Sequence, residues 1–133
     1  MKELSITFPH IFYEPRLDHS IEFLMSNSVQ NNFSTFILIE EGIDKHPKYM
    51  FISTLPNGPT AKYSLTNVLY AHKKKTDIEI TTLPPEKCAL NEIGPAFTLQ
   101  LLSLKDGLIN DKEKMYEFVL RPDMKVNRKK MYL

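Results

Sequence analysis

The stretch that most constrains the fold is residues 55–65, which read LPNGPTAKYSL. Pro56 and Pro59 fix φ at about −65° and have no backbone N–H, whereas Gly58 can adopt the positive φ that strains other residues. The Asn57-Gly58 pair favours a tight reversal, and a residue before a proline is driven toward extended geometry. Because β-forming residues lie on both sides, the stretch predicts a rigid, exposed loop between two strands.

Two functions are open to such a loop. Loops rich in proline and glycine usually do no more than turn the chain, so the sequence favours a plain connection. A loop whose backbone N–H groups are only partly used by strand pairing can also bind an anion such as a phosphate. The plain connection and the anion-binding loop are therefore both hypotheses for residues 55–65.

Length and composition indicate one ordinary globular domain. The chain has 133 residues, of which 42% are hydrophobic and 25% are charged, as is typical of globular domains. There is no run of about 18 apolar residues, so no transmembrane helix is expected, and the N-terminal sequence lacks the features of a secretory signal. Cys88 is the single cysteine, so an internal disulfide is excluded and a reducing compartment is expected.

Charge is distributed unevenly along the chain. Residues 1–61 contain four Lys or Arg and seven Asp or Glu, whereas residues 62–133 contain thirteen and nine. The basic excess lies in residues 73–75 and near the C-terminus, at Arg121, Lys125 and residues 128–130. This distribution indicates a partner that is anionic on one face, for which nucleic acid is the usual case. The alternative is a solvated basic surface.

One amphipathic helix is predicted, over residues 19–30. Its apolar residues recur at helical spacing, at Ile21, Leu24, Met25 and Val29. Asp18 is the expected N-cap, and Asn31-Asn32 is expected to end the helix.

Strands are predicted from runs of β-forming residues bounded by Pro, Gly or Asn. They cover residues 4–8 with 11–13, 33–39, 49–54, 62–69, 78–83, 96–104 and 115–120. Residues 33–39 carry almost no charge, so this strand is expected to be buried on both faces. The order of elements predicts an α/β fold, with α+β as the alternative, built on a mixed β-sheet with few helices.

No residue set for catalysis or metal binding occurs in the sequence. The four histidines and Cys88 fit no metal-ligand spacing, and no nucleotide-binding or hydrolase motif is present. Glu40 and Glu41 fall in a predicted turn, where adjacent carboxylates are usually solvated and do not form an acid–base pair. The sequence therefore predicts a protein that is not an enzyme and has no cofactor.

Three motifs carry a family resemblance. Residues 55–65, residues 92–104 (EIGPAFTLQLLSL) and residues 128–133 (RKKMYL) resemble the Brix-domain proteins, and most closely their ribosome production factor 1 branch. Residues 6–13 and 32–39 stand where that branch has its preceding strands. Only sixteen residues separate Lys75 from Glu92, where the family has a long helix and several strands, so the chain resembles a strongly shortened version of the domain.

The resemblance implies a single domain over residues 1–133, related to the anticodon-binding domains of some tRNA synthetases. It would consist of a first half (1–72), a shortened connection (73–91) and a second half with a basic tail (92–133). The resemblance also implies a nuclear, nucleolar and non-catalytic role in assembly of the large ribosomal subunit. The expected partners are precursor rRNA and other assembly factors, including a maker-16-type protein, with no membrane.

The leading hypothesis is that the chain binds precursor rRNA through phosphate contacts. Folded RNA is recognised largely through shape, phosphates and 2′-hydroxyl groups, which suits a rigid loop with scattered cations. The expected contacts are Asn57, Gly58, Thr60, Lys62, Lys73, Lys74, Lys75, Arg121, Arg128, Lys129 and Lys130. The alternative is a protein-interaction scaffold within pre-ribosomal particles that does not bind RNA directly, which the acidic first half with Glu40-Glu41 supports.

Overall fold

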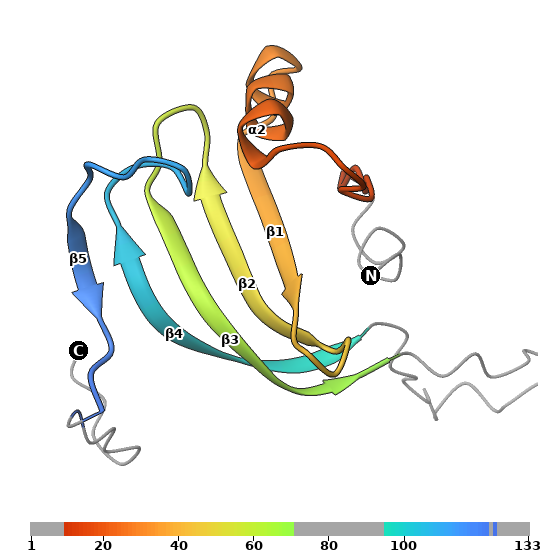
Figure 1. Cartoon of the computed structure of the whole chain (residues 1–133), viewed down its shortest axis with the longest axis vertical. Helices are drawn as coiled ribbons and strands as arrows, with labels where there is room; N and C mark the ends of the chain where they lie inside the picture. Colours follow the sequence, from red (N-terminus) through yellow and green to blue (C-terminus); the bar gives the residue numbers. More distant parts are fainter. Residues whose placement is uncertain (1–9, 71–94, 123, 125–133) are drawn as a thin grey trace, which may run out of the picture. The chain divides into compact units, whose positions relative to one another are not determined.

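A computed structural model describes residues 10–70, 95–122 and 124 of the chain. They form a five-stranded antiparallel sheet with one short helix (Figure 1). The elements are α2 (Ile21–Gln30), β1 (Thr35–Glu41), β2 (Pro47–Thr54), β3 (Thr60–Leu69), β4 (Ala96–Lys105) and β5 (Tyr116–Val119). The strands follow one another across the sheet in chain order. The predicted α/β class with few helices is confirmed.

The chain divides into two compact units, Met1–Pro15 with Asn67–Thr98 and Arg16–Thr66 with Leu99–Leu133. In the described part of the first unit, the Asn67 side-chain amide donates to the Thr98 hydroxyl over 3.4 Å. Helix α2, strands β1, β2 and β5, and the loops at residues 55–59 and 106–115 belong to the second unit. The predicted halves follow a different division, and their connection at residues 73–91 lies outside the described residues, so that division stays a prediction.

Helix α2 begins at a serine cap. The Ser20 hydroxyl accepts a hydrogen bond from the Phe23 backbone N–H at 3.2 Å, which satisfies one of the N–H groups that lack a partner within the helix. Glu22 places a negative charge in the first turn, where the helix dipole favours it. The predicted helix is confirmed. Its predicted cap Asp18 is wrong, because Ser20 occupies the cap position two residues later.

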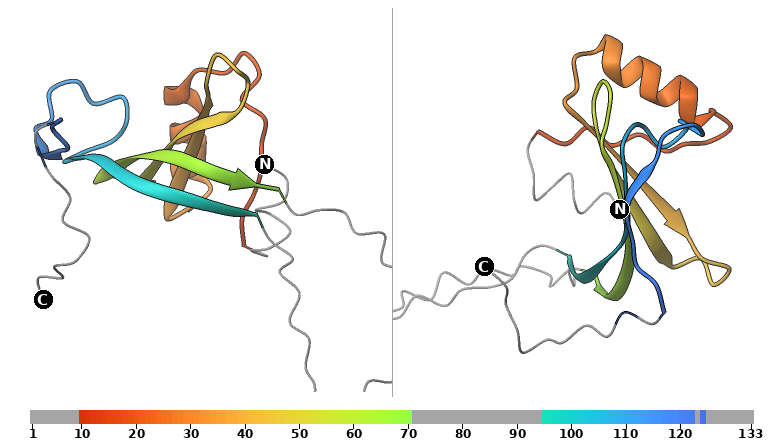
Figure 2. Two further views of the ribbon diagram at one scale, coloured as in Figure 1. Left: turned by 90° about the horizontal axis from the view of Figure 1, so that it is seen from below. Right: turned by 90° about the vertical axis from the view of Figure 1, so that its left-hand side faces the viewer.

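The end of α2 is set by the asparagine pair, as predicted. Asn32 adopts a positive φ of 58°, which asparagine tolerates better than most residues. The Asn32 N–H donates to the Val29 carbonyl, and the Phe33 N–H donates to the Ser28 carbonyl, both at 3.0 Å. This pair of bonds is a Schellman motif, and it leads the chain directly into β1, as the views in Figures 1 and 2 show.

The core of the described residues is small. Its buried apolar side chains are Met25, Leu38, Met50, Leu55 and Leu65. The prediction that the strand at residues 33–39 is buried on both faces is wrong, because only Leu38 of β1 is buried and Ile37 is 42% exposed. The physical reason is the position of β1 at one edge of the sheet.

The other predicted strands have mixed outcomes. Those at residues 49–54, 62–69, 96–104 and 115–120 are confirmed as β2, β3, β4 and β5, with ends shifted by up to two residues. The strand predicted at residues 11–13 is wrong, since these residues have no regular structure. Residues 4–8 and 78–83 lie outside the described part of the chain.

Two loops meet at a pair of glycines. We call residues 55–59, between β2 and β3, the proline loop, and residues 106–115, between β4 and β5, the β4–β5 loop. Gly58 has a φ of +98°, and a Cβ added to it would lie 2.5 Å from the Gly107 backbone carbon. Real Cβ atoms do not approach backbone so closely, so only glycine at this position permits the contact between the loops.

Replacing Gly58 by alanine is expected to lower the free energy of unfolding by roughly 3 kcal/mol, since positive-φ strain of about 1–3 kcal/mol adds to displacement of the Gly107 backbone. Urea unfolding of the full chain measures the loss. Gly42→Ala is the control, because its added Cβ would meet only movable side-chain atoms of Asp44 and Lys48. Equal losses in the two variants would contradict the loop contact.

Replacing Ser20 by alanine is expected to cost about 1 kcal/mol of stability, the usual value of a helix cap. The matched variant Asp18→Ala is expected to change stability by less than about 0.5 kcal/mol, as for an ordinary surface position. Thermal unfolding followed by circular dichroism compares them. A larger loss for Asp18→Ala would show that the cap lies where the sequence first indicated.

Candidate nucleic-acid interface

The backbone of the proline loop is engaged within the protein. Leu55 N–H donates to the Ser34 carbonyl at 2.9 Å, and Gly58 N–H donates to the Thr54 carbonyl at 2.8 Å. Prolines 56 and 59, whose preceding peptide bonds are cis, have no N–H to offer. Among residues 55–59, only the Asn57 N–H lacks a partner in the described part of the chain. A single free N–H does not make an anion cradle, so the structure favours the plain connection.

Thr60, which follows the proline loop, is buried with an exposed fraction of 5%. Its hydroxyl donates to the Gly107 carbonyl at 2.7 Å and lies 2.8 Å from the Ser53 hydroxyl. A threonine has one O–H proton, so Ser53, which is fully buried, donates to Thr60. An RNA contact by Thr60 is not supported by this position, because its hydroxyl is buried and has two partners in the protein.

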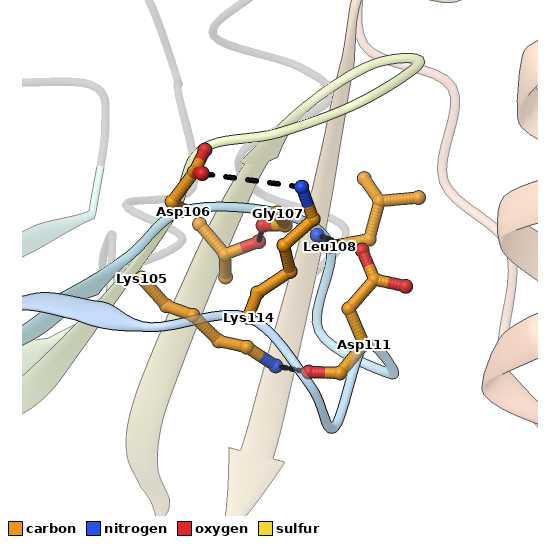
Figure 3. A network of polar contacts seen from close by, with 7 residues as sticks. Lys105, Asp106, Gly107, Leu108, Asp111 and Lys114 are labelled. Carbon is orange, nitrogen blue, oxygen red and sulfur yellow. Dashed lines mark hydrogen bonds and ion pairs between the residues drawn. The ribbon is translucent and has the colours of Figure 1, made fainter.

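The β4–β5 loop is held by its own polar contacts (Figure 3). The Asp111 carboxylate accepts from Leu108 N–H at 2.8 Å, and the Lys105 ammonium donates to the Asp111 carbonyl. Lys114 and Asp106 add an exposed ion pair at 4.0 Å, which contributes little in water. Lys105 is 9% exposed, so this cation holds the loop and is not presented to an external anion.

One face of the sheet carries three rows of directly opposed side chains from β1, β2 and β3. We call it the Lys62 face. Its rows are Phe36–Ser53–Thr60, Leu38–Phe51–Lys62 and Glu40–Tyr49–Ser64. Opposed residues in an antiparallel sheet lie on the same face, and alternate residues along a strand share it. Each of the first two rows contains a buried residue, whereas all three residues of the third row are half-buried.

The Lys62 ammonium lies over two aromatic rings on this face. It is 4.5 Å from the Tyr49 ring centroid and 5.0 Å from that of Phe51. Lys48 places a second ammonium 5.5 Å from the Tyr49 centroid. All three distances lie within the range of cation–π attraction. A half-buried cation among aromatic rings can meet a phosphate and a base together, which is the combination that RNA-binding surfaces use.

The structure places five of the eleven predicted RNA contacts. Asn57 is exposed in the proline loop, Gly58 lies against Gly107, and Arg121 is exposed just after β5. Lys62 stands on the Lys62 face and Thr60 in the interior. The remaining six, Lys73, Lys74, Lys75, Arg128, Lys129 and Lys130, lie outside the described residues, and their contacts stay predictions.

The sequence patterns did not predict Lys48, Tyr49 and Phe51 as residues of the candidate site. The sequence does contain a signal for the aromatic pair. The loop between residues 54 and 60 is short, so the pairing of the two strands can be counted outward from it, and this count places Phe51 opposite Lys62.

Within residues 10–70, 95–122 and 124, no three His, Cys, Asp or Glu side chains are grouped to hold a metal ion. None of the described helices has the length and apolarity to cross a membrane.

Comparison with known proteins finds no matching family model, but three curated relatives are similar to the chain. Ribosome production factor 1 of Mus musculus and that of Pongo abelii are each 24% identical over 192 residues, which cover 99% of this chain. A probable ribosome production factor 1 of Drosophila melanogaster is 23% identical over 89% of the chain. The resemblance that the sequence motifs indicate is confirmed by these similarities.

The chain spans about half the length of the curated relatives it matches, 54% of the two mammalian proteins and 44% of the insect protein. The matched region of 192 residues in the mammalian comparisons exceeds the 133 residues of this chain. These relatives therefore carry additional residues inside the matched region. Internal shortening of this kind is what the sixteen residues between Lys75 and Glu92 predict.

Replacing Thr60 by valine is expected to lower the free energy of unfolding by about 1–3 kcal/mol, because it leaves the buried Ser53 hydroxyl and the Gly107 carbonyl without partners. Thr66→Val, at an exposed position of the same strand, is the control and is expected to change stability by less than about 0.5 kcal/mol. Chemical denaturation measures both. Thr60→Val as stable as the control would show that the buried hydroxyl contacts do not hold the loops.

Proposed function

We propose that this chain is a ribosome biogenesis factor for the large subunit and that it binds precursor rRNA through phosphate contacts. The similarity to three ribosome production factors supports the first part. The uneven charge and the Lys62 face support the second part.

The proposal includes a non-catalytic role and a nucleolar location. Imaging of the tagged chain against a nucleolar marker tests the location. A tagged chain excluded from the nucleolus would contradict that location.

The observation that carries RNA binding is the position of Lys62. Its ammonium lies beside two aromatic rings on one face of the sheet, so a phosphate contact and a base contact can form at one place. Cation–π attraction is worth about 0.5–1 kcal/mol at an exposed site and about 2 kcal/mol when desolvated, and the half-buried Lys62 falls between these values. The ammonium can therefore leave the rings for a phosphate, with release of counterions from the RNA. The basic residues 73–75 and 128–130 would add further phosphate contacts.

A protein-interaction scaffold is the second candidate function. Its support is the exposure of large apolar side chains near the start of α2, where Leu17 is 77% and Phe23 is 56% exposed. Contiguous exposed apolar surface is typical of protein contact sites, and these two residues lie six positions apart in the sequence. A partner of the maker-16 type is the expected occupant. Pull-down after nuclease treatment separates the two functions, since a partner retained without RNA and lost in Leu17→Ser/Phe23→Ser supports the scaffold.

Replacing Lys62 by alanine is expected to weaken binding to a precursor rRNA fragment and to reduce the slope of log affinity against log salt by about 0.7–0.9, the value of one phosphate contact. Fluorescence anisotropy at several salt concentrations measures the slope. Lys112→Ala, at an exposed position of the β4–β5 loop, is the control. An unchanged slope in Lys62→Ala, with RNA still bound, would exclude Lys62 as a phosphate contact.

A further inference from the structure

The third row of the Lys62 face brings three different chemistries together. Glu40 of β1 and Ser64 of β3 lie directly opposite Tyr49 of β2, on either side of it. Ser64 is small, and the long side chain that reaches the tyrosine from β3 is that of Lys62. Glu40 contributes a half-buried carboxylate on the other side, and Lys62 contributes the ammonium over the tyrosine ring.

From this row we infer that the Lys62 face binds an unpaired guanosine of a single-stranded RNA segment. The inference rests on the proposed RNA binding and specifies its ligand. The guanine base would stack on Tyr49, its Watson–Crick edge would meet Glu40, and Lys62 would move from the ring to the adjoining phosphate. A base within a duplex has its Watson–Crick edge occupied, so the site is specific for an unpaired nucleotide.

Binding of the base would replace the Lys62 ammonium on the Tyr49 ring. In the bound state a base would stack on the Tyr49 ring in place of the cation–π contact with Lys62. The displaced ammonium gains a charged partner at the phosphate. Lys62 thus gives up its two ring contacts for the phosphate, and Tyr49 exchanges its contact with Lys62 for a stacked base.

The carboxylate of Glu40 selects the base. An ionised carboxylate has two acceptor oxygens and no donor, so it favours a base edge with two adjacent N–H donors. Guanine presents such an edge through its N1–H and 2-amino groups. Adenine and cytosine each offer one amino group beside an acceptor nitrogen, and uracil offers one N–H between two carbonyls. The acceptors of these bases would face Glu40 unpaired.

The test compares binding of two single-stranded RNA probes. One is a pyrimidine oligonucleotide with one central guanosine. The other has inosine at that position, which differs from guanosine only in lacking the 2-amino group. The full chain is expected to bind the guanosine probe about tenfold more tightly, the lower part of the discrimination of a bidentate base contact. Glu40→Gln is expected to abolish this ratio. Glu41→Gln removes the same charge one residue away, at an exposed position, and is expected to keep it.

Tyr49→Leu is expected to weaken both probes by about tenfold, as loss of one stacked base predicts. The inference is overturned if guanosine and inosine probes bind equally, if Glu41→Gln abolishes the ratio as Glu40→Gln does, or if a duplex of the same sequence binds as tightly as the single strand. In each of these cases RNA is still bound, so the proposed function stands. Failure of every RNA to bind would overturn both.

Discussion

The contact between Gly58 and Gly107 is the constraint on which the described sheet depends. It brings two loops that are far apart in sequence within backbone contact, and the buried hydroxyls of Thr60 and Ser53 join them through the Gly107 carbonyl. Because Thr60 is the first residue of β3 and pairs with Ser53 of β2, the same bonds that join the loops also fix the register of the two strands.

Register decides which residues share a surface. With Ser53 opposite Thr60, Phe51 must face Lys62 and Tyr49 must face Ser64. A slip of one residue would move Lys62 to the other face of the sheet and separate it from both rings. The glycines and the buried hydroxyls therefore contribute indirectly to the proposed RNA binding, since they hold a cation and two aromatic rings in one place.

Local chemistry made much of this predictable. The helix, its asparagine end, the proline loop and five strands follow from periodicity and turn residues. The N-cap of α2 was predicted at the wrong residue because aspartate and serine are both favoured caps. The hydrogen bond from the Phe23 N–H to the Ser20 hydroxyl decides between Asp18 and Ser20. The role of Thr60 was not predictable, because its partner Gly107 is 47 residues away and no sequence pattern links them. Family resemblance indicated ribosome production, yet the cation–π cluster at Lys62 required the strand register.

The central claim is that the Lys62 face contacts precursor rRNA. The most direct measurement is ultraviolet crosslinking of assembled pre-ribosomal particles that contain the full chain, followed by mass spectrometry of the peptide–RNA adducts. Adducts on the peptides that carry Tyr49 and Lys62, with their loss in the Tyr49→Leu chain, are the predicted result. Particles that yield RNA adducts on other segments of the chain, and none on these peptides, would contradict the account.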